Sequence, residues 1–222
     1  MGVADRQPPS PESPVRLLRP PSSTRPALWS LPGRNVVVKD YRGNGLFFRN
    51  TVGRFLVWRE AKVLRRLHGL ENVPSLHGRV RGLALIMEAL PGRPVEGLEH
   101  ASPLPPAFFE RLRELVEAFH ARGVAHCDLK RAPNVLVGEG DEPYVVDWSA
   151  AITASEFRPF PLSLVYRRFL LDDRNAVVKL QLRHRPGDVP PRELERYRRR
   201  GPLERLARRV RDRARKLLQR MA

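Results

Sequence analysis

The chain of 222 residues has few features of a secreted or membrane-spanning protein. It contains one cysteine, Cys127, so no disulfide can form within it and a reducing compartment is expected. Charged residues interrupt every apolar run before it reaches the roughly 18 residues that a transmembrane helix needs. The opening segment MGVADRQPPS has no apolar centre of the kind found in signal peptides, and we therefore expect a cytoplasmic protein.

Acidic residues are scarce: 24 Asp and Glu stand against 41 Lys and Arg, which gives a formal charge of +17. Residues 192–220 hold 13 of the basic and only 4 of the acidic residues. Apolar residues recur there at helical spacing, which predicts a basic amphipathic helix over 201–222. It could dock on the rest of the protein, lie on an anionic membrane surface through residues 202–222, or bind nucleic acid. Nucleic acid is not expected, because no aromatic residues alternate with the basic ones.

Alternating and periodic patterns predict a sheet followed by helices. Residues 1–14 are rich in Pro and Ser and are expected to form a disordered arm. The short apolar segments VRLLR, PALWSL and NVVVKD, and the later run LALIMEAL (83–90), predict strands of a small antiparallel sheet. Apolar residues at helical spacing predict a helix over 55–67, with Glu60 near its apolar stripe.

The second half of the chain predicts further helices around one hairpin. The segment PAFFERLRELVEAFHARG (106–123) has an apolar helical face, and Gly123 stands where a C-terminal cap is expected. NVLV and PYVVD, joined by GEGDE, predict a β-hairpin. The segment EFRPFPLSLVYRRFLL and the last thirty residues predict helices.

An acid, a base and an amide precede this hairpin, and a second acid follows it. The segment VAHCDLKRAPNVLV (124–137) brings Asp128, Lys130 and Asn134 onto the loop before the hairpin, and Asp147 follows it. Each residue alone has an ordinary structural interpretation: a turn residue for Asn134, a helix N-cap for Asp147, a surface ion pair for Glu60. Their order along the chain is the stronger signal.

This order resembles the protein-kinase-like fold, because a lysine ends a strand, a glutamate sits in the next helix, and a His-x-Asp-Leu-Lys segment precedes an asparagine and an aspartate. Within that fold, the sequence is most similar to small bacterial RIO-like kinases and lipopolysaccharide core sugar kinases, over about residues 34–150. The resemblance implies an α+β fold of two lobes: a small antiparallel-sheet N-lobe over 15–90 and a mainly helical C-lobe over 91–200.

The resemblance also implies an ATP-dependent phosphotransferase that moves the γ-phosphoryl group of ATP to a hydroxyl with the help of Mg²⁺. Lys39 would bind the α- and β-phosphates, and Glu60 would pair with Lys39. Asp147 and Asn134 would bind magnesium. Asp128 would orient the acceptor hydroxyl, and Lys130 would contact the γ-phosphate.

Three further residues would form the adenine site. The backbone of Glu88 and Leu90 would meet the adenine edge, and Met87 would line the back of the pocket. His126, which begins the catalytic motif, would be a scaffold group hydrogen-bonded near the Asp147 segment.

The acceptor stays open at this stage. The RIO-like resemblance favours a serine/threonine protein kinase. The short segment after Asp147 and the basic tail favour a lipopolysaccharide core sugar kinase, which would act on an envelope glycolipid as a peripheral protein at the inner membrane surface. A pseudokinase that binds without turnover is the third alternative.

The sequence departs from the kinase pattern in several places, and three of these bear directly on the predicted site. RPPSSTRP stands where a Gly-x-Gly-x-x-Gly loop is expected, so phosphates there would need Ser22, Ser23 and Thr24. Six positions separate Asp128 from Asn134, whereas the common loop has five. Trp148-Ser149 replaces Phe-Gly after the metal-binding aspartate, which leads to the hypothesis of a permanently assembled site.

Overall fold

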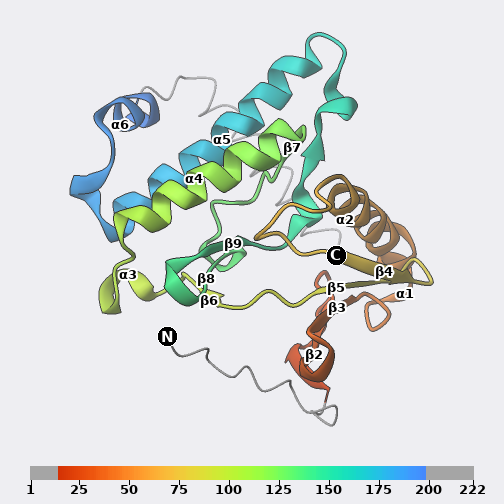
Figure 1. The fold of residues 1–222 in the computed structure, drawn as a ribbon. Coiled ribbons are helices and arrows are strands. Elements are labelled where there is room, and N and C mark those ends of the chain that lie inside the picture. The colour runs from red at the N-terminus through yellow and green to blue at the C-terminus, as the bar shows by residue number, and fades with distance from the viewer. Residues whose placement is uncertain (1–14, 199–222) are drawn as a thin grey trace. The chain divides into compact units, whose positions relative to one another are not determined.

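The computed structural model describes residues 15–198, and the predicted arm (1–14) and basic helix (201–222) lie outside this range. The chain divides into two compact units. Within the described range, unit 1 comprises residues 15–91 together with 147–150, and unit 2 comprises 92–146 and 151–198. Each unit is described by itself below (Figure 1).

Unit 1 is built on a five-stranded antiparallel sheet in the order β1-β2-β3-β5-β4. The strands are β1 (Arg16–Arg19), β2 (Ala27–Leu31), β3 (Val36–Asp40), β4 (Leu76–Val80) and β5 (Ala84–Glu88). This confirms the three predicted N-terminal strands and the strand predicted from LALIMEAL. The sequence LHGRV of β4 was not predicted, because a glycine interrupts it and it has few apolar residues.

One continuous helical run follows β3. It consists of α1 (Leu46–Phe48), a π-helical segment (Arg49–Gly53) and α2 (Arg54–Arg66), and the residues at both junctions keep right-handed helical backbone angles. The predicted helix over 55–67 therefore exists and begins earlier than expected. The three residues of α1 are too few to show a helical period of apolar residues, so the sequence did not indicate this earlier start.

The inner face of α2 packs on the sheet and forms the core of unit 1. Val57 and Ala61 of α2 are fully buried against Leu85 and Met87 of β5. Val37 on β3 also contacts this cluster. Since side chains alternate along a strand, Lys39 shares the α2-facing side of β3 with Val37.

Unit 2 is mainly helical. Its helices are α3 (Leu98–Ala101), α4 (Pro106–Ala121), α5 (Leu162–His184) and α6 (Pro191–Arg198). The long helices α4 and α5 run side by side (Figure 1). The α4 helix confirms the predicted period, and Gly123 just beyond it has the left-handed φ of 69° expected of a cap. Residues 154–157 form only a 3-10 turn, so α5 begins later than the segment EFRPFPLSLVYRRFLL suggested.

Short strands complete unit 2. The predicted hairpin is confirmed: β8 (Val135–Val137) pairs with β9 (Pro143–Val145), and β6 (Arg93–Pro94) extends this sheet. A second small sheet pairs β7 (Val124–Ala125) with β10 (Ile152–Thr153). The α+β class, with an antiparallel sheet first and helices after it, is as predicted. Within residues 15–198, no helix combines the length and apolar character that crossing a membrane requires.

Candidate active site

Three of the predicted site residues meet in unit 1. The Lys39 Nζ donates hydrogen bonds to both carboxylate oxygens of Glu60, at 3.1 and 2.9 Å. It also lies 2.7 Å from Oδ1 of Asp147. The three residues come from β3, α2 and the segment after β9. Lys39 and Asp147, which are in direct contact, are 108 positions apart in the sequence.

This ion pair is buried from solvent. Lys39 is 5% exposed and Glu60 is 1% exposed. Burial by itself would lower the pKa of Lys39, but the carboxylates of Glu60 and Asp147 outweigh it, so the pKa is raised and the amine stays protonated. Asp147 is more open, with a third of its side chain exposed. Lys39 can therefore present a fixed positive charge next to an accessible carboxylate.

The segment after β9 is fixed to α2 by its own contacts. The Trp148 side chain is fully buried, and its backbone N–H donates a hydrogen bond to the Glu60 carboxylate. The Ser149 hydroxyl donates to Oδ1 of Asp147 at 2.8 Å. Ser149, which replaces the usual glycine, thus helps to orient the aspartate.

Two other predicted residues are joined in unit 2. The buried Asn134 donates its side-chain N–H to the backbone carbonyl of Asp128 at 3.0 Å. Its amide oxygen is then the atom that a magnesium ion would use. Asp128 itself is partly exposed, and its Oδ2 lies 3.4 Å from Nη1 of Arg131. Lys130 is exposed on the same loop.

The loop that carries Asp128 is held by Asp173 on α5, a residue that the sequence patterns did not indicate. Its Oδ2 accepts the backbone N–H of His126 at 2.7 Å, and its Oδ1 accepts that of Cys127 at 3.0 Å. The His120 Nε2 lies 3.1 Å from the same carboxylate. Asp173 is 1% exposed and shares one helix face with the buried Val177 and Leu180. A carboxylate at core spacing was the signal that could have revealed it.

Two residues in or next to the predicted catalytic segments have a left-handed backbone conformation. Cys127 has a φ of 66° and Asp147 a φ of 63°. Such angles are uncommon for residues other than glycine and persist where the surroundings impose them. For Cys127, the hydrogen bond to Asp173 supplies that constraint. Its side chain has no role in the predicted chemistry.

His126 has the scaffold position that the motif implied. It is fully buried, and its Nε2 lies 3.0 Å from the carbonyl oxygen of Val146, the residue before Asp147. Its Nδ1 accepts the backbone N–H of Asp128 at 3.3 Å.

The predicted adenine-site residues lie at the end of β5. Met87 is buried in the core cluster against α2. The backbone N–H of Glu88 donates to Ser75 at 2.9 Å, and its carboxylate accepts the Ser75 N–H at 3.1 Å. Leu90 is half-buried after the strand. The end of β5 is therefore held by two hydrogen bonds between Glu88 and Ser75, the residue before β4.

The β1–β2 turn, which replaces the glycine-rich loop, is closed on itself. The Ser22 backbone N–H donates to the Arg25 carbonyl at 3.0 Å, and the Ser22 hydroxyl accepts the Arg25 N–H at 3.2 Å. The buried Asn44 donates to the carbonyls of both residues, at 2.6 and 3.0 Å. The Ser22 backbone N–H is therefore not available to a phosphate, whereas Ser23 and Thr24 are exposed.

A family model described as the RIO domain matches residues 38–162. The chain belongs to the RIO domain family. The match spans every predicted site residue from Lys39 to Asp147, and it shows that the chain is related to kinases. The strands β1 and β2 lie outside the match. A search of the curated proteins found no match.

The residues of this RIO domain fit ATP and Mg²⁺ by their chemistry. Within the described range, no three His, Cys, Asp or Glu side chains are grouped so that they could hold a metal by themselves. The Asp147 carboxylate and the Asn134 amide oxygen are each a ligand type that Mg²⁺ accepts, with phosphate oxygens and water as its usual further ligands. The protonated Lys39 suits a phosphate group.

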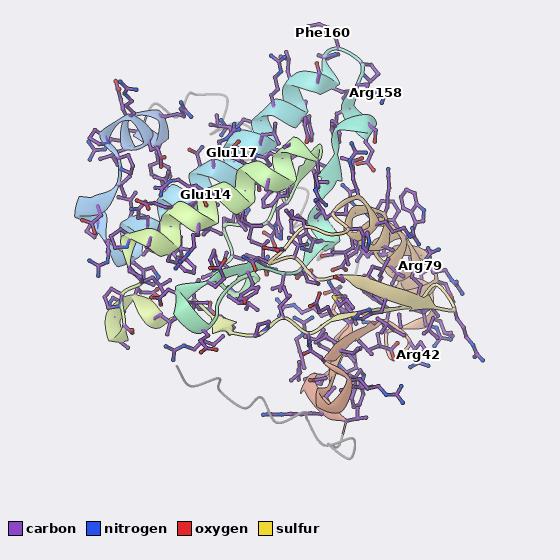
Figure 2. The ribbon with its side chains drawn as sticks, in the orientation of Figure 1. Arg42, Arg79, Glu114, Glu117, Arg158 and Phe160 are labelled. Carbon is purple, nitrogen blue, oxygen red and sulfur yellow. The ribbon has the colours of Figure 1, made fainter. Side chains whose placement is uncertain are left out.

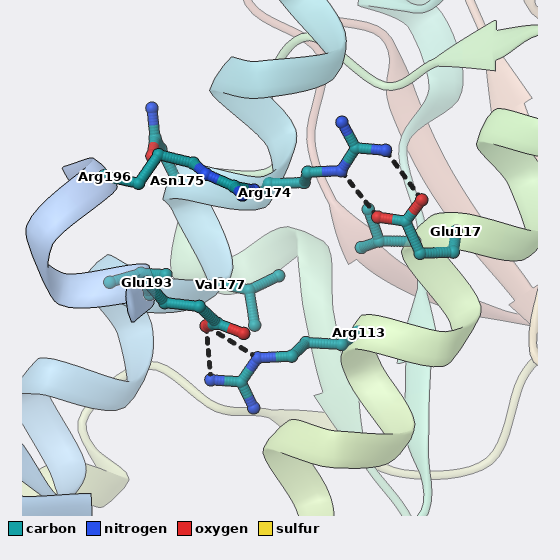
Figure 3. A pocket seen from close by; sticks show the side chains of 9 residues that line it. Arg113, Glu117, Arg174, Asn175, Val177, Glu193 and Arg196 are labelled. Carbon is teal, nitrogen blue, oxygen red and sulfur yellow. Dashed lines mark hydrogen bonds and ion pairs between the residues drawn. The ribbon is translucent and has the colours of Figure 1, made fainter. Parts of the chain in front are cut away.

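A cavity of about 240 Å³ lies apart from these residues, between α4, α5 and α6 of unit 2 (Figure 3). Arg113 pairs with Glu193 at 2.9 Å, and Arg174 pairs with Glu117 at 2.6 and 2.7 Å. Arg113 also donates to Gln181. None of the predicted site residues lines this cavity, and its volume is below that of usual ligand pockets. We interpret it as a gap between helices that charged pairs close.

Proposed function

We propose that this RIO domain transfers the γ-phosphoryl group of ATP to the hydroxyl of a serine or threonine in a protein, with Mg²⁺. The observation that supports this most is the buried Lys39–Glu60 pair next to the open carboxylate of Asp147. A lysine with no catalytic or ligand role would rarely be buried between two carboxylates, because desolvation is costly.

Each residue has a role in the proposed reaction. Lys39, positioned by Glu60, binds the α- and β-phosphates and offsets their charge. The Asp128 carboxylate accepts the proton of the acceptor hydroxyl. The oxygen of that hydroxyl forms a bond to the γ-phosphorus as the bond between the γ-phosphorus and the bridging β,γ-oxygen breaks, and ADP leaves. Lys130 contacts the transferring group. Magnesium bound through Asp147 and Asn134 would supply positive charge against the triphosphate.

The test is transfer of labelled phosphate from ATP, with autophosphorylation, a proteome extract and purified lipopolysaccharide as separate acceptors. We expect Asp128→Asn and Asp147→Asn to reduce transfer at least about 100-fold. Asp141→Asn is the matched control, since Asp141 is exposed on the β8–β9 turn, and it should transfer at the native rate. Transfer at the native rate in both Asp128→Asn and Asp147→Asn would refute the proposed phosphotransferase activity. Label that enters lipopolysaccharide alone would replace the protein acceptor by the glycolipid.

A pseudokinase is the second candidate, and the closed β1–β2 turn favours it, because Ser22 has no free backbone donor for a phosphate. Calorimetric titration with ATP and Mg²⁺ separates the two candidates. A pseudokinase would bind ATP in a way that Lys39→Met weakens, but would show no transfer to any acceptor.

A further inference from the structure

The helical run over residues 46–66 exposes an unusual number of large apolar side chains. Leu46 is 68% exposed, Phe47 82% and Val52 41%. Phe55 and Trp58 are each about half exposed, and their rings lie 5.9 Å apart. We call these five residues the outer face. A soluble surface usually scatters such residues singly, so a group of this kind indicates a binding surface.

This outer face is distinct from the face that holds the core. The buried residues Val57, Ala61 and Leu64 of α2 face the rest of unit 1. Phe55 and Trp58 are three positions apart, so they are neighbours on the opposite side of the helix. The π-helical segment, in which the Thr51 hydroxyl donates to the Phe47 carbonyl at 2.7 Å, changes the helical spacing between Phe47 and Phe55. Such segments are frequent at functional sites.

The charge around the outer face is mainly positive. Residues 41–70 contain seven Lys and Arg, of which Arg42 pairs with Asp40 at 2.7 Å, and Glu60 is the acidic residue within the segment. Glu60 is buried and paired with Lys39, so it does not offset the surface charge. Basic groups also lie over the exposed rings: the Arg59 guanidinium is 5.8 Å from the Phe55 ring centre, and the Lys62 Nζ is 5.4 Å from that of Trp58.

We propose that the outer face of the 46–66 helical run binds the surface of an anionic phospholipid bilayer. Aromatic and aliphatic side chains enter the interfacial layer, while surrounding Lys and Arg contact acidic headgroups. Nucleic acid fits less well, because Leu46 and Val52 offer nothing on which a base can stack. An acidic protein would need a complementary apolar patch, whereas a bilayer supplies apolar and anionic character together.

The chain carries its own probe for this contact. It has three tryptophans. Trp148 is fully buried and Trp29 is half-buried on β2, whereas Trp58 belongs to the outer face. Residues 199–222 contain no tryptophan, so quenching of Trp58 reports the outer face and not the basic tail.

The experiment mixes the full chain with vesicles of phosphatidylcholine, with or without phosphatidylglycerol, that carry brominated acyl chains. We expect anionic vesicles to quench the emission of the native chain and of Trp29→Phe, and to have little effect on Trp58→Phe. Higher salt should weaken the effect, because it screens the headgroup charge. Unquenched Trp58 on vesicles that bind the chain would overturn the proposal.

Substitutions test the basic and the apolar contributions to binding separately. Arg65→Gln with Arg66→Gln should weaken binding about fivefold for each charge removed. Phe47→Gln should weaken it on the order of tenfold, because an exposed ring leaves the interface. Phe160→Gln is the matched control: Phe160 is 80% exposed beside Arg158 in the segment before α5 (Figure 2). Equal losses from Phe47→Gln and Phe160→Gln would overturn the assignment to this face.

The same variants can show whether the outer face binds a nucleic acid or an acidic peptide instead of a bilayer. Binding of a short nucleic-acid duplex or an acidic peptide that Phe47→Gln abolishes, with no quenching by vesicles, would assign the face to that partner and refute the bilayer. The assay contains no ATP, so its failure is separate from a failure of the proposed phosphotransfer.

Discussion

The buried carboxylate of Asp173 on α5 accepts the backbone N–H of His126 at 2.7 Å. The same carboxylate accepts the N–H of Cys127, so one side chain fixes two successive peptide groups just before Asp128. The shape of the candidate catalytic loop thus depends on a residue that takes no part in the proposed chemistry. This relationship leads to the first prediction.

Asp173→Asn should lower the free energy of unfolding by about 1.5–3 kcal/mol, because it weakens hydrogen bonds to a charged acceptor and turns an amide donor toward backbone donors. Urea denaturation measures this change. Asp172→Asn is the matched control, since Asp172 is partly exposed and pairs with Arg168 on the same helix. It should cost less than about 1 kcal/mol. Equal losses from the two variants would contradict the role of Asp173.

Lys39 and Glu60 should show strong energetic coupling. Lys39→Met should cost about 3–5 kcal/mol, because it leaves the buried Glu60 charge without Lys39. Glu60→Gln should cost less, because Lys39 still pairs with Asp147 at 2.7 Å. The double variant should lose less than the sum of the two, and a double-mutant cycle by urea denaturation measures the difference. The exposed pair Arg168 and Asp172, 3.1 Å apart, should couple by less than about 1 kcal/mol. Additive losses at Lys39 and Glu60 would contradict a buried ion pair.

His184 should make stability depend on pH below its ordinary pKa of 6.5. Burial lowers the pKa of His184, and its Nδ1 already accepts the Leu104 N–H at 3.3 Å, so a proton there would face another donor. The unfolded chain then binds the proton more readily, and stability that is present above pH 6.5 should be lost as the pH falls through the lower folded pKa.

Unfolding free energies measured between pH 8 and pH 5 test this, with nuclear magnetic resonance titration of the imidazole as a direct check. His184→Asn keeps an acceptor for Leu104 but cannot gain a proton, so its profile should be flatter than that of the native chain. His77→Asn, at an exposed position on β4, is the control for loss of an imidazole. A native slope in His184→Asn would contradict the prediction.

Gly92→Ala should destabilise the protein by more than about 1 kcal/mol. Gly92 has a φ of 121°, and a Cβ there would lie 2.7 Å from the Val137 carbonyl oxygen on β8. Gly45→Ala is the control, because its φ is −54° and nothing lies within 4 Å of an added Cβ. That change should be neutral or slightly stabilising. Thermal unfolding of both variants compares them, and a stable Gly92→Ala would contradict the close approach.

The sequence predicts best where one local pattern is enough. The apolar run of β5 and the helical period of α4 are visible without tertiary information, and both elements exist. The β4 strand was missed, because its pairing with β5 and not its own composition makes it a strand.

The candidate site divides in the same way. The contact of Lys39 with Glu60 and Asp147 follows from the order of motifs, and the distances agree with it. The closed turn around Ser22 could not be predicted, since it depends on Asn44, 22 residues away. Asp173 lies 46 positions from the residue whose N–H its Oδ1 accepts, so its spacing with Val177 and Leu180 could mark it as buried but could not identify its partner.

The membership of Asp147–Ala150 in unit 1 has a consequence for biosynthesis. On the ribosome, the first 91 residues emerge well before the tryptophan that fills the space beside α2 and donates to Glu60. Until position 150 has left the exit tunnel, the nascent sheet therefore has an unfinished core and a glutamate with one donor fewer. Chaperones that recognise exposed apolar surface should bind the growing polypeptide in this interval and release it when the late segment inserts.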